Sequence, residues 1–149
     1  GEIRWDGQDV FQMDNAYRKL LGYLPQDFGY YPDFSIYDYL MYIASIKGIR
    51  PAAAKERASR LLKQVGLSQA RHKKMKTLSG GMKRRLALAR ALLAVSDAVA
   101  LDEPFTGLDE ENRRRAVLCV AAAAETKPVI LVTHDRTELN LLRANIVNL

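Results

Sequence analysis

The hydrophobic positions of this chain fall into short continuous runs and longer helical stretches, and the two kinds alternate. Short apolar runs bounded by proline, glycine or polar residues are typical of buried strands. They predict strands at residues 21–24, 97–104, 128–132 and 145–149. Helices are predicted at residues 15–20, 35–47, 51–65, 69–73, 81–94, 110–125 and 135–142. Strands that are apolar on both faces and alternate with helices indicate an α/β fold with a parallel sheet covered by helices.

Residues that cap helices and form turns support several of these boundaries. Ser35 followed by Asp38 resembles a capping box, and Gly66 is expected to end the helix before it. The Asp-Gly pair at residues 6–7 lies between two short runs and predicts a hairpin turn. The stretch 35–76 is almost entirely helical, so we expect an all-helical insertion followed by the second half of an α/β sheet.

The composition is that of one globular domain or a large part of one. The 149 residues carry a formal net charge of +6 and a single cysteine, Cys119, which cannot form an internal disulfide. No apolar stretch approaches the ~20 residues that span a bilayer, and the first residues lack the layout of a signal peptide. We therefore expect a cytosolic chain. The basic residues, such as the run Lys83, Arg84 and Arg85, have no interleaved aromatics, which predicts solvated helix faces and no binding to nucleic acid.

Two acidic residues, Asp102 and Glu103, end the apolar run in VALDEP. Open α/β sheets place their ligands at the carboxyl ends of the strands. Because side chains alternate along a strand, the two carboxylates are expected to do different work. One can hold Mg²⁺, and the other can orient and polarise an attacking water. Taken alone, an acidic pair that caps a turn is the alternative interpretation.

Two further polar residues follow predicted strands. His134 comes after PVILVT and is expected near Glu103, because parallel strands end at the same edge of a sheet. Its imidazole can donate a hydrogen bond to a phosphate oxygen. Gln26 follows LLGYLP and enters the helical insertion, where its amide offers an oxygen to a metal as well as a donor. Taken singly, a structural histidine and a polar turn residue are the alternatives.

Ser79, Gly80 and Gly81 stand directly before a long basic helix. Glycines let the backbone approach an anion closely, Ser79 adds a hydroxyl donor, and the helix dipole attracts negative charge. The chain contains no G-x-x-x-x-G-K-[ST] sequence, which leaves open whose phosphate this helix meets. Asp109 follows the turn FTGL and is expected to cap the helix 110–125, a role that is compatible with a contact between subunits.

Five short motifs, taken in order, give the chain a family resemblance: YLPQ, LSGGM, VALDEP, TGLD and VTHD. They resemble the Q-loop, signature, Walker B, D-loop and H-loop of the ATP-binding domain of an ABC transporter. The resemblance covers nearly the whole chain and implies a P-loop NTPase-like parallel sheet. It also implies three parts: residues 1–26 as the remainder of the N-terminal core, 27–77 as a helical subdomain, and 78–149 as the signature helix with the C-terminal half of the core.

The resemblance implies a role for each candidate at the strand ends. Asp102 would hold Mg²⁺, and Glu103 would be the general base for ATP hydrolysis. His134 would be the switch histidine that senses the γ-phosphate. Gln26 would contact the metal and the attacking water, and it would couple the site to the membrane partner.

The glycine-led helix would serve the opposite subunit of a dimer. Ser79, Gly80 and Gly81 would bind the γ-phosphate of ATP held by a second ATP-binding subunit, and Asp109 would cross the interface. Met82 stands where the signature usually has glutamine, which removes an amide contact to the nucleotide and leaves the backbone donors. This form of the signature resembles exporter subunits that pair with separate transmembrane permease subunits, so export and a place at the inner face of the cell membrane are expected.

The family's phosphate loop has no counterpart in these residues. The resemblance places it upstream of GEIRWDG, so we expect an incomplete or truncated chain that by itself hydrolyses ATP no faster than background. In this fold the absent segment is expected to supply a strand and a helix beside the Walker B strand. Without them, that central strand would lose backbone partners and the sheet would expose apolar surface.

Two other classes of protein stay open at this point. A chromosome-maintenance ATPase with the same signature would act on DNA, but Gln26 and Ser79 lie 53 positions apart, which fits a compact helical insertion and not a long coiled coil. A truncated module that dimerises or regulates without hydrolysis would fit the missing phosphate loop, whereas the intact catalytic candidates favour an enzyme. The aromatic stretch near residues 28–31 is expected to receive a coupling helix of the membrane subunit.

Overall fold

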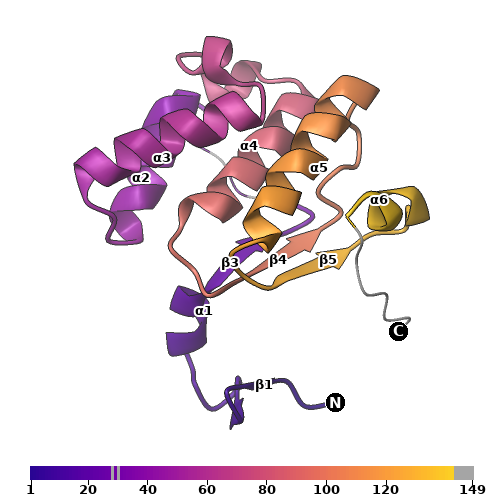
Figure 1. Ribbon diagram of the computed structural model, residues 1–149. Helices are drawn as coiled ribbons and strands as arrows, with labels where there is room; N and C mark the ends of the chain where they lie inside the picture. The colour runs from indigo at the N-terminus through magenta and orange to yellow at the C-terminus, as the bar shows by residue number, and fades with distance from the viewer. Residues whose placement is uncertain (28, 30, 143–149) are drawn as a thin grey trace.

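The computed structural model describes residues 1–27, 29 and 31–142, and it has an α/β fold (Figure 1). Its centre is a three-stranded parallel sheet in the order β3–β4–β5. The strands are β3 (Leu21–Leu24), β4 (Ala98–Asp102) and β5 (Val129–Val132). These strands confirm three of the predicted runs. The fourth, predicted at residues 145–149, lies outside the described residues.

The helices agree with the predicted ones to within one residue at each end, with one exception. They are α1 (Ala16–Leu20), α2 (Ile36–Ile46), α3 (Pro51–Gln64), α4 (Gly80–Leu93), α5 (Glu110–Ala124) and α6 (Arg136–Leu141). The exception is the helix predicted at residues 69–73, which is wrong. The chain forms two 3₁₀ turns instead, η1 (Ser68–Ala70) and η2 (Met75–Thr77).

The reason for this difference lies in the backbone partners of the segment. The carbonyls of Arg71 and Lys73 accept hydrogen bonds from Tyr37 N and Ile36 N at 2.9 and 3.1 Å, at the start of α2. The amides that would continue a helix here are also used elsewhere, since Met75 N and Lys76 N donate to Phe34 O and Pro32 O at 2.9 and 3.0 Å. The segment is therefore fastened to the start of α2.

Side-chain caps begin four of the described helices, α2, α4, α5 and α6; in α6 an Asp135 carboxylate oxygen accepts from Thr137 N at 2.8 Å. The Ser35 hydroxyl accepts from Asp38 N at 3.0 Å, the Ser79 hydroxyl accepts from Met82 N at 3.2 Å, and an Asp109 carboxylate oxygen accepts from Asn112 N at 2.9 Å. Each cap satisfies an amide that has no partner within its own helix. The entrance of α4 is therefore fixed by Ser79 although two glycines follow it.

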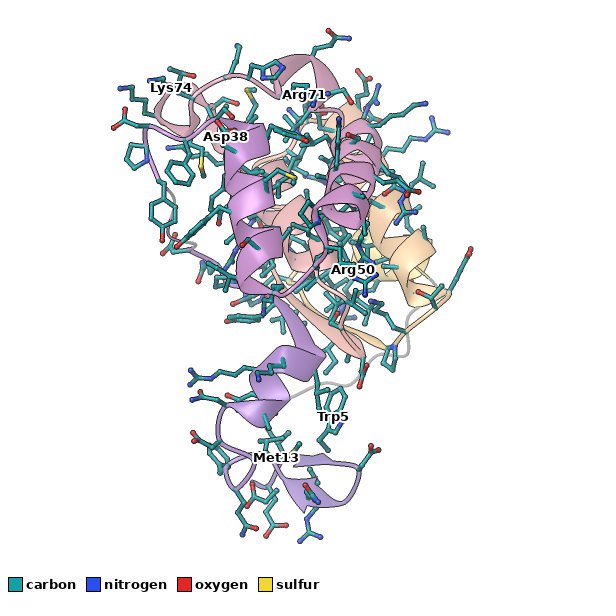
Figure 2. The ribbon with its side chains drawn as sticks, turned by 90° about the vertical axis from the view of Figure 1, so that its left-hand side faces the viewer. Trp5, Met13, Asp38, Arg50, Arg71 and Lys74 are labelled. Atoms are coloured by element: carbon teal, nitrogen blue, oxygen red, sulfur yellow. The ribbon has the colours of Figure 1, made fainter. Side chains whose placement is uncertain are left out.

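The first residues form a small hairpin at one end of the molecule. It pairs β1 (Arg4–Trp5) with β2 (Gln8–Asp9), and the predicted Asp-Gly turn between them has positive φ at both residues. Figure 2 shows Trp5 and Met13 at this end, and Asp38 and Lys74 at the other end, near the start of α2.

Helices α4 and α5 cover one face of the sheet, and α2 and α3 pack together against α4 (Figure 1). The covered face carries the side chains of Leu24, Val99 and Leu101, each at most 1% exposed. They join the buried side chains of α4, such as Leu86 and Leu88, in one core. Apolar burial of this kind is the main favourable term in folding.

The opposite face of the sheet is exposed. Tyr23, Ala100 and Ile130 lie side by side across the three strands, and Tyr23 and Ile130 are 52% and 60% exposed. The expectation of exposed apolar surface is therefore met on this face. The expectation that the central strand loses its backbone partners is wrong, because β4 pairs with β3 on one side and with β5 on the other. The two edges are β3 and β5, each of which pairs only with β4 among the described residues.

The prediction that the basic run of α4 lies on a solvated face is wrong for its arginines. Arg85 is buried, and its Nη1 donates to the carbonyls of Val65 and Gly66 at 2.9 and 3.0 Å. Burial of a guanidinium is tolerated where its donors are satisfied. Arg85 therefore ties α4 to the end of α3.

We expect Gly22→Ala to lower the free energy of unfolding by about 2 kcal/mol, the usual range for overpacking. A Cβ at Gly22 would lie 2.5 Å from the backbone oxygen of Ala91 in α4, so the helix and the sheet would have to separate. Urea unfolding followed by circular dichroism measures the change. Gly80→Ala is the control, because no atom lies within 4 Å of a Cβ there; equal destabilisation of both variants would contradict the steric explanation.

Candidate functional site

The carboxyl ends of β3, β4 and β5 and the first turn of α4 surround an open cleft of about 830 Å³. Its lining includes six of the residues singled out from the sequence, namely Gln26, Gly80, Gly81, Asp102, Glu103 and His134. Parallel strand direction explains this meeting, because all three strands deliver their next residues to the same edge. The cleft is therefore built from segments that are far apart in the sequence.

Glu103 is held in an unusual backbone conformation at the end of β4. Its φ is +48°, a region that residues other than glycine seldom adopt. Its amide donates to Val132 O of β5 at 2.8 Å, which continues the sheet pairing by one residue. One carboxylate oxygen accepts from the Thr106 hydroxyl at 3.0 Å, and the other accepts from His134 N at 3.1 Å. The carboxylate is thus oriented from two sides and is 17% exposed.

The structure brings His134 and Glu103 together, as the sequence predicts. The imidazole Nε2 lies 3.5 Å from a carboxylate oxygen of Glu103. The two partners differ in exposure, since the His134 side chain is 97% exposed. The imidazole therefore stands at the mouth of the cleft, where it can reach a ligand that enters from solvent.

Asp102 and Gln26 supply oxygen atoms of the kind that Mg²⁺ prefers. Both line the cleft, and among the described residues neither side chain has a hydrogen-bond partner. The described residues contain no group of three His, Cys, Asp or Glu side chains that could hold a metal by themselves. Mg²⁺ usually takes one or two protein ligands and completes its shell with water and phosphate oxygens. The donor set therefore fits Mg²⁺ that arrives with a phosphate ligand.

The first turn of α4 is open toward the cleft. A Cβ at Gly80 would meet no atom within 4 Å, whereas one at Gly81 would touch the turn at Gly107 and Leu108 at 3.6 Å. Met82 is not part of the lining; its side chain packs against the core and its amide donates to Ser79. Nothing in the described chain requires a glycine at residue 80, and the bare backbone there faces outward.

Asp109 lies outside the lining of the cleft, at the start of α5. Its carboxylate accepts from the Asn112 amide and side chain at 2.9 and 2.7 Å. These hydrogen bonds from Asn112 lower the pKa of the Asp109 carboxyl. The expected capping role is confirmed, and the exposed carboxylate remains directed away from the core.

Arg84 is a component of the site that the sequence did not reveal. Its guanidinium lines the cleft and donates to the backbone carbonyls of Glu103 and Gln26 at 2.5 and 2.8 Å. Partial burial lowers the pKa of this guanidinium, and the nearby carboxylates of Asp102 and Glu103 act in the opposite direction. A long side chain that bonds main-chain atoms of two distant segments leaves no periodic signal in the sequence.

Glu138 is a second such residue, on α6 behind His134. It is 5% exposed, and its carboxylate accepts from the Thr133 hydroxyl at 2.7 Å. Burial raises the pKa of the Glu138 carboxyl, and the Thr133 hydrogen bond acts in the opposite direction. A buried acid next to the Thr133–His134 corner stabilises the turn that carries the imidazole.

Comparison with known proteins shows the family to which this chain belongs. The family model described as ABC transporter matches residues 1–106, well over half of the chain. This chain belongs to the ABC transporter family, and it represents the ATP-binding domain of that family. In the described part of the chain, no helix is long and apolar enough to cross a membrane.

Several relatives are similar over most of the chain. An ABC transporter ATP-binding protein of Haemophilus influenzae is 40% identical over 118 residues, which cover 79% of this chain and 49% of that protein. The linearmycin resistance ATP-binding protein LnrL of Bacillus subtilis is 32% identical over 143 residues, which cover 95% of this chain and 46% of that protein. The phospholipid-transporting ATPase ABCA3 of Rattus norvegicus is 35% identical over 135 residues, which cover 91% of this chain and 8% of that protein. The chain thus spans less than half the length of these relatives.

A solved structure supports the fold. It is described as an ATP binding subunit of an ABC transporter and matches with a TM-score of 0.81 at 24% identity, covering 93% of this chain and 58% of that chain. At this identity the likeness concerns the fold alone. The family and the fold are therefore established.

We expect Glu138→Gln to raise the free energy of unfolding at neutral pH and to raise it by less in acid. The raised pKa means that the protonated carboxyl suits the folded state, so its stabilising contribution is present at low pH and is lost as the pH rises through that pKa. Glutamine keeps an oxygen for the Thr133 hydroxyl and carries no charge. Urea unfolding at pH 4 and pH 7 measures the gain in unfolding free energy, which is expected to be larger at pH 7; a gain that is equal at both pH values would contradict this explanation.

Proposed function

We propose that this chain binds and hydrolyses ATP as part of an ABC transporter, in a dimer that drives transport through a partner permease. The observation that carries the proposal is the cleft, where Gln26, Asp102, Glu103 and His134 meet the open first turn of α4. The intact catalytic candidates and their proximity support hydrolysis over a role as a non-catalytic module.

Glu103 is proposed as the general base. Its two carboxylate oxygens are oriented by Thr106 and by the amide of His134, so the remaining lone pairs can face a water in the cleft. That water would lose its proton to Glu103 as its oxygen attacks the γ-phosphate. His134 is proposed to donate a hydrogen bond to the γ-phosphate, where negative charge develops.

Asp102 and Gln26 are proposed to face Mg²⁺ that is bound to the nucleotide. The ion would draw negative charge away from the transferred phosphoryl group. Both side chains lie at the strand ends that line the cleft. Gln26 also begins the connection toward α2, so a change at the nucleotide is proposed to reach the helical part of the chain through this residue.

The first turn of α4 is proposed to bind the γ-phosphate of ATP held by a second ATP-binding subunit. Ser79 supplies a hydroxyl, and Gly80 and Gly81 supply backbone N–H groups at the positive end of the helix dipole, whereas the Met82 amide donates to Ser79 Oγ. The open space beside Gly80 supports this proposal. Asp109, exposed at the start of α5, is proposed to cross the same dimer interface.

Permease subunits in the membrane are proposed as the second partner, with the chain at the cytoplasmic face and export as the direction. An aromatic cluster supports the position of this contact: Tyr31 stacks on Phe34 at 5.0 Å and meets Tyr42 edge-on at 5.3 Å. Tyr31 and Tyr42 remain 45% and 39% exposed, which suits a docking surface. Of the stretch expected to receive a coupling helix, Phe28 and Tyr30 lie outside the described residues.

Substitution of the proposed base tests the activity. We expect Glu103→Gln to lower the rate of ATP hydrolysis by about 100-fold or more, because an amide cannot accept the proton of water. The affinity for ATP is expected to stay within about threefold, since the groups that bind phosphate are unchanged. Steady-state hydrolysis and equilibrium nucleotide binding of the protein expressed in full from its gene measure both. Glu111→Gln, at an exposed position of α5, is the control; full hydrolysis by Glu103→Gln would refute the proposed role.

A pair of isosteric variants tests the open first turn of α4. Gly80→Asp is expected to leave the melting temperature unchanged or higher, because an acidic residue in the first turn of a helix is favourable and a Cβ there has room. Its hydrolysis is expected to fall about 10-fold below that of Gly80→Asn, since only the carboxylate repels a phosphate. Thermal unfolding and hydrolysis assays of both variants measure this. Equal hydrolysis by the Asp and Asn variants would argue against a phosphate at this turn.

A further inference from the structure

The Arg84 side chain connects three segments of the chain at the cleft. It leaves α4 one turn after Gly80, and its guanidinium reaches the ends of β3 and β4. Nε and Nη2 donate to Glu103 O at 2.9 and 2.5 Å, and Nη2 also donates to Asp102 O at 3.0 Å. Nη1 donates to Gln26 O at 2.8 Å and to Pro25 O at 3.2 Å. Every partner is a main-chain carbonyl.

The chemistry of the guanidinium suits this task. It is planar, remains charged, and carries five N–H donors in a fixed fork. Hydrogen bonds from a charged donor are stronger than neutral ones, and partial burial shields them from water. A lysine ammonium has three donors on a single atom at the end of a flexible stem, so it cannot span carbonyls of two strands in the same way.

The position of Arg84 relates the two halves of the site. Residues four apart on a helix lie on the same face, so the guanidinium and the open backbone at Gly80 are on one side of α4. Three of its hydrogen bonds go to two carbonyls at the end of β4, two to Glu103 O and one to Asp102 O. Glu103 has positive φ there. A residue in that conformation persists only where its surroundings hold it.

We propose that Arg84 is a positioning residue for hydrolysis: it fixes the main chain of Gln26 and Glu103 relative to the first turn of α4. This inference rests on the proposed function and adds a residue to it. Arg84 touches no reacting atom and acts through the carbonyls that it holds. A displacement of the catalytic base by about 1 Å is enough to lower a rate by up to about 100-fold.

The neighbouring Arg85 provides a matched control. It lies on the same helix, and its Nη1 donates to Val65 O and Gly66 O at 2.9 and 3.0 Å, away from the strand ends. Its Nε lies 3.4 Å from Gly81 O within the same helix, a long hydrogen bond beside two short ones. Arg84→Lys and Arg85→Lys both keep the charge and lose the fork. Both are expected to lower the melting temperature by similar amounts, but only Arg84→Lys releases the carbonyls at the cleft.

The test uses the protein expressed in full from its gene. Arg84→Lys and Arg84→Gln are expected to lower kcat about 10-fold or more while KM for MgATP stays within about threefold, because the groups that bind phosphate are retained. Arg85→Lys is expected to keep kcat within twofold at a temperature where all variants are folded. A kcat of Arg84→Lys within twofold of the unaltered protein would overturn the proposal. So would an equal loss in Arg85→Lys, or a failure of both Arg84 variants to fold, since the side chain would then act in folding alone.

Hydrogen exchange without nucleotide separates this inference from the proposed function. The amides of Glu103 and His134 donate to Val132 O and to the Glu103 carboxylate. Both amides are expected to exchange about 10-fold faster in Arg84→Lys and at an unchanged rate in Arg85→Lys. If the unaltered protein hydrolyses no ATP, the proposed function fails and exchange alone decides on Arg84. Equal exchange in the two variants would then overturn the positioning role.

Discussion

The parallel pairing of β4 with β3 and β5 is the constraint on which the site depends. Backbone hydrogen bonds place Leu24 opposite Leu101 and Asp102 opposite Val132, and the Glu103 amide extends the pairing to Val132 O. Because the strands run in the same direction, the residues that follow them come to one edge. A slip of one residue between strands would turn every side chain to the other face. The contact between Glu103 and His134 is therefore a consequence of the register and needs no attraction of its own.

The two faces of the sheet differ in how far they are covered. Helices α4 and α5 cover one face, whereas Tyr23, Ile130 and Val132 of the other face are all more than half exposed. Parallel sheets are normally covered on both faces, and full burial of each such side chain is worth about 1.5–3 kcal/mol. The matched relatives are at least twice as long as their match to this chain, so they contain further structure. The open cleft and the open face therefore lie on surfaces that the described residues leave uncovered.

Local signals in the sequence predict most of the fold and a large part of the site. The caps at Ser35, Ser79 and Asp109 are read from side chains that satisfy amides within three residues, and the strands are read from short apolar runs. The proximity of Glu103 and His134 follows from strand direction. By contrast, the central place of β4 depends on strand order, which no local pattern encodes. The same holds for Arg84, whose partners lie up to 59 residues away and are main-chain atoms that any residue would offer.

The two adjacent arginines of α4 show how a helix start can be both open and rigid. Successive residues on a helix point in directions about 100° apart, so Arg84 reaches the strand ends while Arg85 reaches the end of α3. The helix is thus fastened to the sheet and to α3 directly after its first turn, and Ser79 caps that turn from within. Two glycines would otherwise make this turn mobile, because glycine loses the most freedom on ordering. Rigidity supplied by neighbours allows bare backbone to face a ligand without the loss of entropy that a flexible loop would suffer on binding. One side chain, Arg84, connects this part of α4 directly to the main chain of Glu103.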